Sequence, residues 1–238
     1  MAVHLKANTV RARLYEAYAT EHAGVDDVTS TRRNVETEIL PHLDDSGSEV
    51  LDIGCGQGTV VGILADQGFH ATGIDISPEQ VEIARSRGIN VILGDYVDYL
   101  DLRKNYFSAV IAIDLLEHLS KDEILVSMDS IQQALKPGGK FICRAPNALS
   151  PLSGRIVHGD LTHENAFTPS SVKQLCKAVR FSAVDIYPCP PTWHGAVSGI
   201  RLLVWKVYSA LVKTAYAAET GMMRGHIVSM NLLFCARK

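Results

Sequence analysis

The sequence predicts one α/β domain: a doubly wound, seven-stranded, mostly parallel sheet with N-terminal helices and a helical insertion before the last strand. Two observations carry this prediction. Short apolar runs alternate with longer amphipathic stretches along most of the 238 residues, which is typical of parallel strands joined by helices on both faces of a sheet. The first apolar run also ends in a glycine-rich turn, as expected at the ligand-binding edge of such a sheet. The length suits one domain better than two.

Seven apolar runs are expected to form the strands, because each is short and bounded by turn residues. A Lys-Pro-Gly-Gly turn at residues 136–139 is expected to precede the fifth strand. The strands are predicted at residues 49–53, 71–74, 91–93, 107–113, 140–144, 182–187 and 227–235.

The helices are predicted from apolar residues at helical spacing and from residues that begin or end a helix. Ser77 can cap the helix that follows it, Pro78 suits its first turn, and Gly68 can end the preceding helix. The predicted helices span residues 10–22, 31–43, 59–67, 121–135, 170–178 and 200–218, and one more begins at residue 77.

Composition narrows the classes of function. A net charge of -3 provides no overall attraction to nucleic acid, so we expect no nucleic-acid partner. The five cysteines form no CxxC pair and no cluster with zinc spacing, which favours free thiols and a cytoplasmic protein. The first residues lack the apolar core of a signal peptide. No run reaches the roughly 18 apolar residues of a membrane span.

Glycines follow the first predicted strand at alternate positions between residues 54 and 58. Glycine lets the backbone turn sharply and approach a ligand without a clashing Cβ. A dinucleotide-binding turn of the GxGxxG type would place its third glycine at position 59, but that residue is Thr59. The GxGxG form, preceded by an aspartate, resembles motif I of the class I S-adenosylmethionine-dependent methyltransferases. The resemblance implies that the amino-acid end of the cofactor lies against Asp52, Gly54, Cys55, Gly56 and Gly58.

Acidic residues end the second and third predicted strands. Asp75 can accept hydrogen bonds from both ribose hydroxyls of a nucleoside, in dehydrogenases as in methyltransferases. The resemblance implies that Asp95 contacts the adenine amino group, although Asp95 can instead cap the next helix. It adds Ile76, Gly94, Tyr96, Asp114 and Leu115 to the cofactor-binding residues.

Two later motifs extend the resemblance to small-molecule O-methyltransferases. One is Asp-Leu-Leu-Glu-His-Leu at residues 114–119, after the fourth strand, and the other is Lys-Pro-Gly-Gly-Lys at residues 136–140. Together the matches cover roughly residues 49–146. They imply a Rossmann-like methyltransferase fold, S-adenosylmethionine as the methyl donor and S-adenosylhomocysteine as its product.

Methyl transfer from this donor needs an aligned acceptor, and alignment alone can contribute on the order of 7–11 kcal/mol. A hydroxyl acceptor also gains from a general base, worth roughly 10²–10⁴-fold. His118 and His163 are the candidate bases, although His118 can instead anchor its helix and His163 can be a solvated loop residue. Asp160, His163 and Glu164 are plausible cation ligands, but their spacing does not demand a metal and we predict none.

Polar residues after the fifth strand and in two insertions are expected to contact the acceptor: Arg144, Asn147, Glu164 and Trp193. Arg144 can equally form a structural ion pair. Tyr18, in the N-terminal helices, is expected either to close the cofactor site or to pack against the core. The single domain, residues 1–238, is thus divided into a helical lid (1–46), a cofactor-binding core (47–148) and acceptor-site insertions (149–168 and 188–226).

The second insertion holds the helix at 200–218. From residue 201 to the end of the chain there are six Lys or Arg residues and one acid, Glu219. The helix is therefore interpreted as the cover of a pocket for an anionic or glycosylated acceptor, as a peripheral contact with a membrane, or as a core helix with one solvated face.

The resemblance extends to bacterial methyltransferases of glycan and secondary-metabolite pathways and, less closely, to O-methyltransferases of quinone biosynthesis. We therefore expect O-methylation of a small, sugar-containing or lipid-linked acceptor. The alternatives are N- or C-methylation of another metabolite, a nicotinamide-dependent oxidoreductase, and a non-catalytic cofactor-binding protein. Nucleic-acid methylation is disfavoured because the Asn/Asp-Pro-Pro-aromatic signature is missing after the fourth strand. The sequence leaves the oligomeric state unassigned.

Overall fold

The computed structural model describes residues 28–238. Its strands are β1 (Glu49–Ile53), β2 (His70–Asp75), β3 (Val91–Leu93), β4 (Phe107–Ile113), β5 (Leu135–Pro146), β6 (Ala183–Pro188) and β7 (Asn231–Arg237). Its helices are α2 (Val28–Asn34), α3 (Thr59–Asp66), α4 (Pro78–Ser86), α5 (Tyr96–Asp101), α6 (Lys121–Ala134), α7 (Gly154–Val157), α8 (Pro169–Ala178) and α9 (Ala196–Thr220), with helical turns η1 (Val35–Ile39), η2 (Leu40–His42) and η3 (Leu116–His118).

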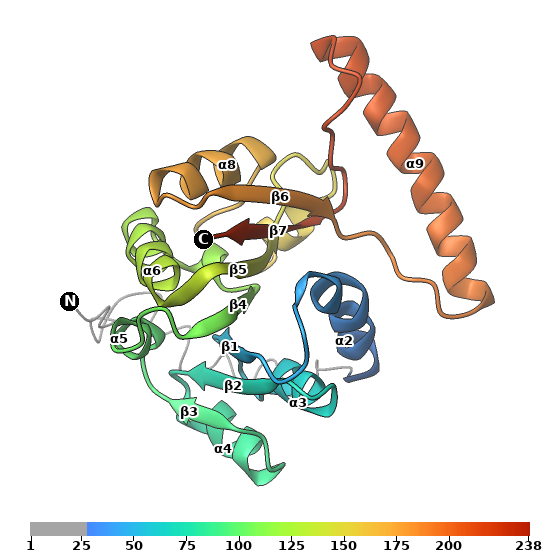
Figure 1. Ribbon diagram of the computed structural model, residues 1–238. Coiled ribbons are helices and arrows are strands. Elements are labelled where there is room, and N and C mark those ends of the chain that lie inside the picture. The colour runs from blue at the N-terminus through green and yellow to red at the C-terminus, as the bar shows by residue number, and fades with distance from the viewer. Residues whose placement is uncertain (1–27) are drawn as a thin grey trace.

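The seven strands form one sheet in the order β3-β2-β1-β4-β5-β7-β6 (Figure 1). Strand β7 runs antiparallel to both β5 and β6, and the other neighbouring pairs are parallel. From β1 the chain builds outward through β2 to β3, and it then crosses back to place β4 on the other side of β1. In such sheets, ligands bind beyond the carboxyl ends of the strands at this switch point. The predicted fold class is confirmed.

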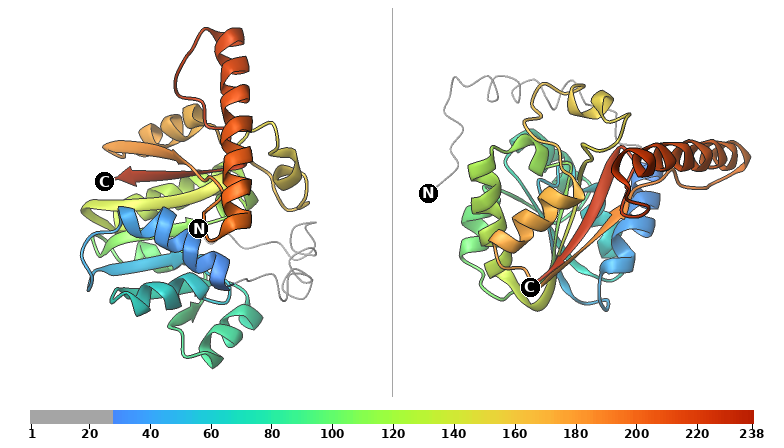
Figure 2. Two further views of the ribbon diagram at one scale, coloured as in Figure 1. Left: turned by 90° about the vertical axis from the view of Figure 1, so that its right-hand side faces the viewer. Right: turned by 90° about the horizontal axis from the view of Figure 1, so that it is seen from above.

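Two apolar clusters cover opposite faces of the sheet, because successive strand residues point to opposite sides. Leu51 and Ile53 of β1 pack into a cluster with residues of α5, α6 and α8. Val50, the residue before Leu51, packs on the other face with residues of η1 and α3. Figure 2 shows these two layers of helices on either side of the sheet. The carboxyl ends of the strands, where a ligand is expected, therefore belong to a sheet that is buried on both faces.

Local signals explain where several helices begin. Ser77 caps α4 by accepting from the Gln80 N–H, as expected from the sequence. Ser120 and Glu123 form a capping box at the start of α6. Such caps satisfy N–H groups that have no partner inside the helix.

The predicted turn at residues 136–139 is wrong as a boundary, because these residues belong to β5. Phe107 pairs with Leu135 and Ala109 pairs with Lys140, so β5 carries extra residues as an irregularity beside β4. Here a local glycine signal marks a bulge inside a strand instead of its start.

Other parts of the prediction also differ from the structure. The last strand begins at Asn231 instead of residue 227, because residues 227–230 contact the loop after β5 through Asn147. The stretch predicted as one helix at 31–43 is divided among α2, η1 and η2. The short elements α5, η3 and α7 were not predicted, since each offers too few residues for a clear helical period. The predicted helix at 10–22 lies outside the described residues.

Helix α9 projects beyond the sheet and its flanking helices (Figures 1 and 2). It spans 25 residues, with Ser198 and Ser209 as its fully buried positions. Within residues 28–238, no helix combines the length and the apolar character that crossing a membrane requires. The five cysteines are free thiols.

Candidate functional site

The loop between β1 and α3 is a sharp turn held by the end of β2. Gly54, Gly56 and Gly58 have positive φ angles of 67°, 51° and 73°. The Gly54 N–H donates to the Ile74 carbonyl at 2.9 Å, and the Gly56 N–H donates to Asp75 Oδ2 at 2.8 Å. The backbone of this loop is therefore bent toward the carboxyl end of the sheet, as the sequence predicted.

Two of these glycines leave no room for a side chain. A Cβ on Gly54 would lie 2.9 Å from Leu115 Cδ1, and one on Gly58 would lie 2.8 Å from Ile89 Cγ2. The glycine loop thus packs directly against the segment that follows β4. Residues after β1 and β4 consequently form one continuous site.

Asp52 precedes the loop and is buried, with 3% of its surface exposed. Burial, and then the charge of Asp75, raise the pKa of Asp52 to about 8. A cationic ligand, such as the ammonium group of S-adenosylmethionine, would favour its ionised form. Cys55 packs over Gly73, where a Cβ would lie 2.5 Å from its sulfur. Burial raises the pKa of the Cys55 thiol, so it suits packing better than nucleophilic chemistry.

The end of β2 presents an acid and an apolar side chain. Besides its contact with the glycine loop, Asp75 accepts from the Ser77 N–H through Oδ1 at 2.8 Å. Each carboxylate oxygen has a second acceptor site, so both can also receive a ribose hydroxyl. Ile76 is 51% exposed. This arrangement fits a nucleoside whose ribose meets Asp75 while its ring covers Ile76.

The end of β3 combines a helix cap with a tyrosine anchor. Asp95 caps α5 by accepting from the Val97 N–H at 2.7 Å, so the alternative role that the sequence left open is present. The Tyr96 hydroxyl forms a 2.7 Å hydrogen bond with Ser127 of α6. The adenine contact of Asp95 and the cofactor contact of Gly94 remain predictions.

Arg144 of β5 and Asp114, which follows β4, form an ion pair with two contacts. Arg144 Nε donates to Asp114 Oδ1 at 3.2 Å, and a second nitrogen donates to Oδ2. Burial opposes the charged form of Arg144, but Asp114 raises its pKa. Glu38 of η1 lies 3.9 Å from Arg144 and was missed by the sequence analysis, because a single acid on a predicted helix carries no site signal. The structural ion pair considered for Arg144 is present.

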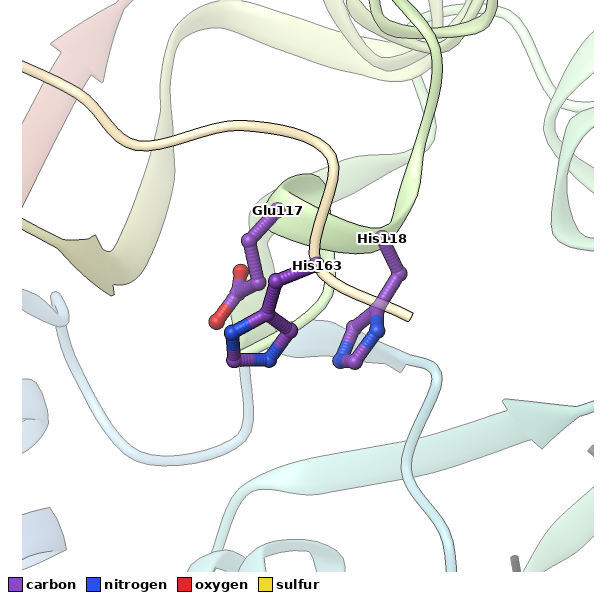
Figure 3. Close-up of side chains that lie close together, drawn as sticks. All are labelled: Glu117, His118 and His163. Atoms are coloured by element: carbon purple, nitrogen blue, oxygen red, sulfur yellow. The ribbon is translucent and has the colours of Figure 1, made fainter. Parts of the chain in front are cut away.

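Glu117, His118 and His163 lie together, with side chains from η3 and from the loop after α7 (Figure 3). One ligand-type atom from each lies within 4.8 Å of the others, and the two imidazole rings meet edge to face at 4.5 Å. The two segments are joined because the Glu164 and Asn165 N–H groups donate to the Glu117 carbonyl, at 2.7 and 3.1 Å. The structure thus brings the two predicted base candidates into contact.

Hydrogen bonds define the tautomer of both histidines. The Thr162 hydroxyl donates to Asp160 at 2.6 Å, so the same oxygen accepts from His118 Nδ1 at 2.8 Å. His163 Nδ1 lies 3.0 Å from the Ile156 carbonyl, which can only accept. Both rings therefore carry their proton on Nδ1 when neutral, and Nε2 is the basic nitrogen of each.

Glu117 is 1% exposed. Neither of its carboxylate oxygens has a hydrogen-bond partner among the described residues. Burial, and then the charge of Asp114, raise the pKa of Glu117 to about 8. The sequence analysis did not choose Glu117 as a site residue, although it stands beside His118 in the post-strand motif.

The remaining predicted residues have other surroundings. Asn147 is fully buried, and its amide nitrogen donates to the carbonyls of Ile227 and Ser229 at 2.9 and 2.8 Å. Its side-chain donors are used within the chain, and the acceptor contact of Asn147 remains a prediction. Glu164 is exposed, and Trp193 is 72% exposed against Gly199 at the start of α9. Tyr18 lies outside the described residues.

Comparison with known proteins identifies the family of the chain. Residues 29–186, more than half of the chain, match the family model described as methyltransferase domain. The chain is 36% identical over 110 residues to the ubiquinone biosynthesis O-methyltransferase of Xylella fastidiosa (strain 9a5c), an alignment that covers 43% of each protein. It is 26% identical over 159 residues to the protein of the same name from Idiomarina loihiensis, covering 59% of this chain and 64% of the relative. The chain thus spans less than two thirds of these relatives.

Solved structures share the fold. A SAM-dependent methyltransferase from Archaeoglobus fulgidus superposes with a TM-score of 0.70 at 19% identity, covering 94% of this chain and 99% of the other. Phosphoethanolamine N-methyltransferase 2 of Haemonchus contortus, solved with S-adenosyl-L-methionine, gives 0.60 at 17% identity, covering 88% of this chain and 52% of the other. The chain belongs to the methyltransferase-domain family, and its fold is that of the class I S-adenosylmethionine-dependent methyltransferases.

Proposed function

We propose that the chain transfers the methyl group of S-adenosylmethionine to a hydroxyl of a small acceptor. The single observation that carries the proposal is the contact between two bases: His118, in the segment after β4 that adjoins the glycine loop, and His163, in the loop after α7. A neutral hydroxyl is a weak nucleophile and gains from proton removal, whereas a neutral amine already presents a lone pair. Relatives named as O-methyltransferases support the same choice over N- or C-methylation.

The residues at the edge of the sheet fit the methyl donor. The bend at residues 54–58 offers backbone without side chains to the amino-acid end. Asp75 offers acceptors to the ribose, and the buried Asp52 offers a negative charge to a cationic ligand. The cofactor supplies an activated methyl group, so the protein has to bind it, align the acceptor and accept one proton.

The transfer balances without a further reactant. The S–CH₃ bond breaks as an O–CH₃ bond forms, and the sulfonium becomes the thioether of S-adenosylhomocysteine. The hydroxyl proton passes to Nε2 of His118 or His163 and from there to solvent. The Thr162–Asp160 chain on His118 stabilises the imidazolium that results, because Asp160 is held ionised: burial opposes this, but the Thr162 hydrogen bonds lower its pKa.

The exposed face of helix α9 favours an acceptor that is presented at a membrane surface. Its solvent-facing side carries apolar residues spaced by three and four, so they form one stripe. Their exposed fractions run from 56% to 75%. Arg201, Lys206 and Lys213 add positive charge, which complements anionic lipid. The Tyr216 hydroxyl ties the helix to the loop after β5 through the Leu149 carbonyl. The stripe consists of Val197, Ile200, Val204, Val207 and Leu211.

Vesicle flotation tests this part of the proposal. The chain should float with vesicles that contain anionic lipid and remain in solution with purely zwitterionic ones. The double variant Val204→Ser and Val207→Ser should lose most of that binding, whereas Leu102→Ser, at a position 82% exposed elsewhere, should not. Equal flotation of all three proteins would show that α9 does not bind the membrane.

Methyl transfer is tested with donor labelled on the methyl group. The chain is incubated with labelled S-adenosylmethionine and a panel of phenols, catechols, sugars and amines, and products are separated by mass spectrometry. We expect label on oxygen of at least one hydroxylated acceptor, with one S-adenosylhomocysteine formed per methyl transferred. Label confined to amines would overturn the O-methylation proposal, and donor binding without product would favour the non-catalytic alternative.

A further inference from the structure

A pair of general bases would need only the two imidazoles, but the cluster of Glu117, His118 and His163 also contains a carboxylate. It combines one carboxylate and two imidazoles from two distant segments, with ligand-type atoms within 4.8 Å of one another. Figure 3 shows the three side chains directed into the same space. Spacing along the sequence gave no sign of this set, because the fold alone joins η3 to the loop after α7.

The carboxylate of Glu117 is the first independent sign of a ligand. It is 1% exposed, and neither oxygen has a hydrogen-bond partner among residues 28–238. Leaving a buried carboxylate without a partner is costly, and buried charges in proteins are normally paired or coordinate a metal. The side chain is therefore arranged for a positively charged partner that the described side chains do not supply.

The imidazoles are prepared for the same partner. A metal-binding histidine usually donates its second ring N–H to a carbonyl or to a chain ending in a carboxylate, which orients the ring. His163 donates to the Ile156 carbonyl, and His118 donates to Thr162, which in turn donates to Asp160. In each neutral ring Nε2 is then the nitrogen that carries the lone pair.

The surrounding charge also favours a cation. The carboxylates of Asp114 and Asp160 add negative charge near Glu117, and the guanidinium of Arg144 adds positive charge there. Arg144 is already held by Asp114 and Glu38. Asp160 Oδ2 lies 4.0 Å from His163 Nε2, close enough to serve as a further ligand after a small movement.

We propose that Glu117, His118 and His163 form a binding site for a divalent transition metal of the zinc class. Mixed nitrogen and oxygen ligands suit zinc and its neighbours, whereas magnesium and calcium prefer oxygen alone. Zinc–ligand distances of about 2.0–2.2 Å place ligand atoms roughly 3–3.5 Å apart. The three ligand atoms would have to move by less than about 2 Å to reach that spacing. The metal would keep open coordination positions for water or an acceptor oxygen.

The metal site deepens the proposed function and depends on it only for the role of the cation. A cation at this position would bind the acceptor hydroxyl and lower its pKa, so the proton could leave to solvent at neutral pH. The histidines would then act as ligands, and both would be needed together.

The test measures metal binding without donor or acceptor. The chelator-treated chain is titrated with Zn²⁺ against a chromophoric chelator. The ligand variants are Glu117→Gln and His163→Gln. Glu82→Gln, on the exposed side of α4, and His70→Gln, exposed at the opposite end of β2, are the matched controls. We expect one Zn²⁺ per chain, a Kd at least tenfold larger in both ligand variants, and control values within twofold of the parent.

Co²⁺ absorption of the parent chain provides a readout that does not depend on the folding of a variant. Visible d–d bands without thiolate charge transfer support a nitrogen and oxygen site. Thiolate charge transfer, substoichiometric Zn²⁺, or unchanged affinity in both folded ligand variants would overturn the proposal. If Zn²⁺ does not bind while methyl transfer proceeds, the cation site falls and the proposed function stands. If Zn²⁺ binds but no methylated hydroxyl is found, the cation site stands and the proposed O-methylation falls.

Discussion

Arg144 and Asp114 hold the ends of β5 and β4 together from both side chain and backbone. The Asp114 N–H donates to the Arg144 carbonyl at 3.1 Å, and the Arg144 guanidinium contacts both oxygens of the Asp114 carboxylate. Asp114 has a φ of 52°, in the left-handed region that non-glycine residues rarely adopt. The ion pair therefore stabilises the bend that leads from β4 into η3. Glu117 and His118 lie in η3, so their position depends on this bend.

Arg144→Met should destabilise the fold, because it leaves the Asp114 and Glu38 carboxylates facing each other without their cation. We expect the free energy of unfolding to fall by roughly 1.5–3 kcal/mol, the range for hydrogen bonds to charged groups. Chemical denaturation measures this loss. The control Arg155→Met, at an exposed position in α7, should stay within about 0.5 kcal/mol of the parent. A similar loss of stability in both variants would contradict a stabilising role of the ion pair.

Gly58→Ala should cost more stability than Gly88→Ala, although both glycines have nearly the same φ, 73° and 76°. A Cβ on Gly88 meets nothing within 4 Å, so only the left-handed conformation is penalised, by about 1–2 kcal/mol. A Cβ on Gly58 also overlaps Ile89, and overpacking adds about 1–3 kcal/mol. Denaturant unfolding of both variants checks the difference, and equal losses would contradict the packing contact.

Asp52 should make stability fall as the pH rises. Its folded pKa of about 8 lies above its ordinary value of 3.8, so the native state binds more protons than the unfolded state between these values. The free energy of unfolding should therefore decrease from about pH 4 toward pH 8 and then level off. Urea unfolding at several pH values should show a smaller decrease for Asp52→Asn. Parallel profiles of the two proteins would be inconsistent with a protonated Asp52.

Asp75→Ala should weaken binding of S-adenosylhomocysteine by tenfold or more, since one charged hydrogen bond contributes roughly 1.5–3 kcal/mol. The variant also loses the contact that holds the Gly56 N–H. Calorimetric titration measures the affinity, with Asp98→Asn, an exposed acid of α5, as the control. An unchanged affinity would place the ribose elsewhere.

His118→Ala and His163→Ala distinguish the roles open to the pair. With the acceptor found in the product screen, loss of a general base should lower turnover by roughly 10²–10⁴-fold while S-adenosylhomocysteine still binds. If one histidine is the base, only its replacement should produce the full loss. If both hold a cation, both replacements should produce it. Full turnover in both variants would show that neither acts in the reaction.

Much of the fold could be predicted because its signals are local. The strands at 49–53, 91–93 and 107–113 have the predicted bounds, since each is an apolar run between turn residues. The cap at Ser77 and the positive φ angles of the glycine loop depend on neighbouring residues alone. The bulge in β5 shows the limit of such signals, because whether Gly138 and Gly139 end a strand or interrupt it depends on the register with β4.

The amino-acid sequence by itself determined the order of strands and helices, the side-chain-free bend after β1 and the acids that follow β2 and β3. Each of these follows from the conformational preferences of a few adjacent residues. Only the tertiary structure decided that Arg144 meets Asp114, that Asn147 spends its donors on residues 227–229, and that Glu117 and His118 face His163. These contacts join segments 30 to 82 residues apart, and their geometry is set by the register of the sheet and the packing of its loops, which no local pattern encodes.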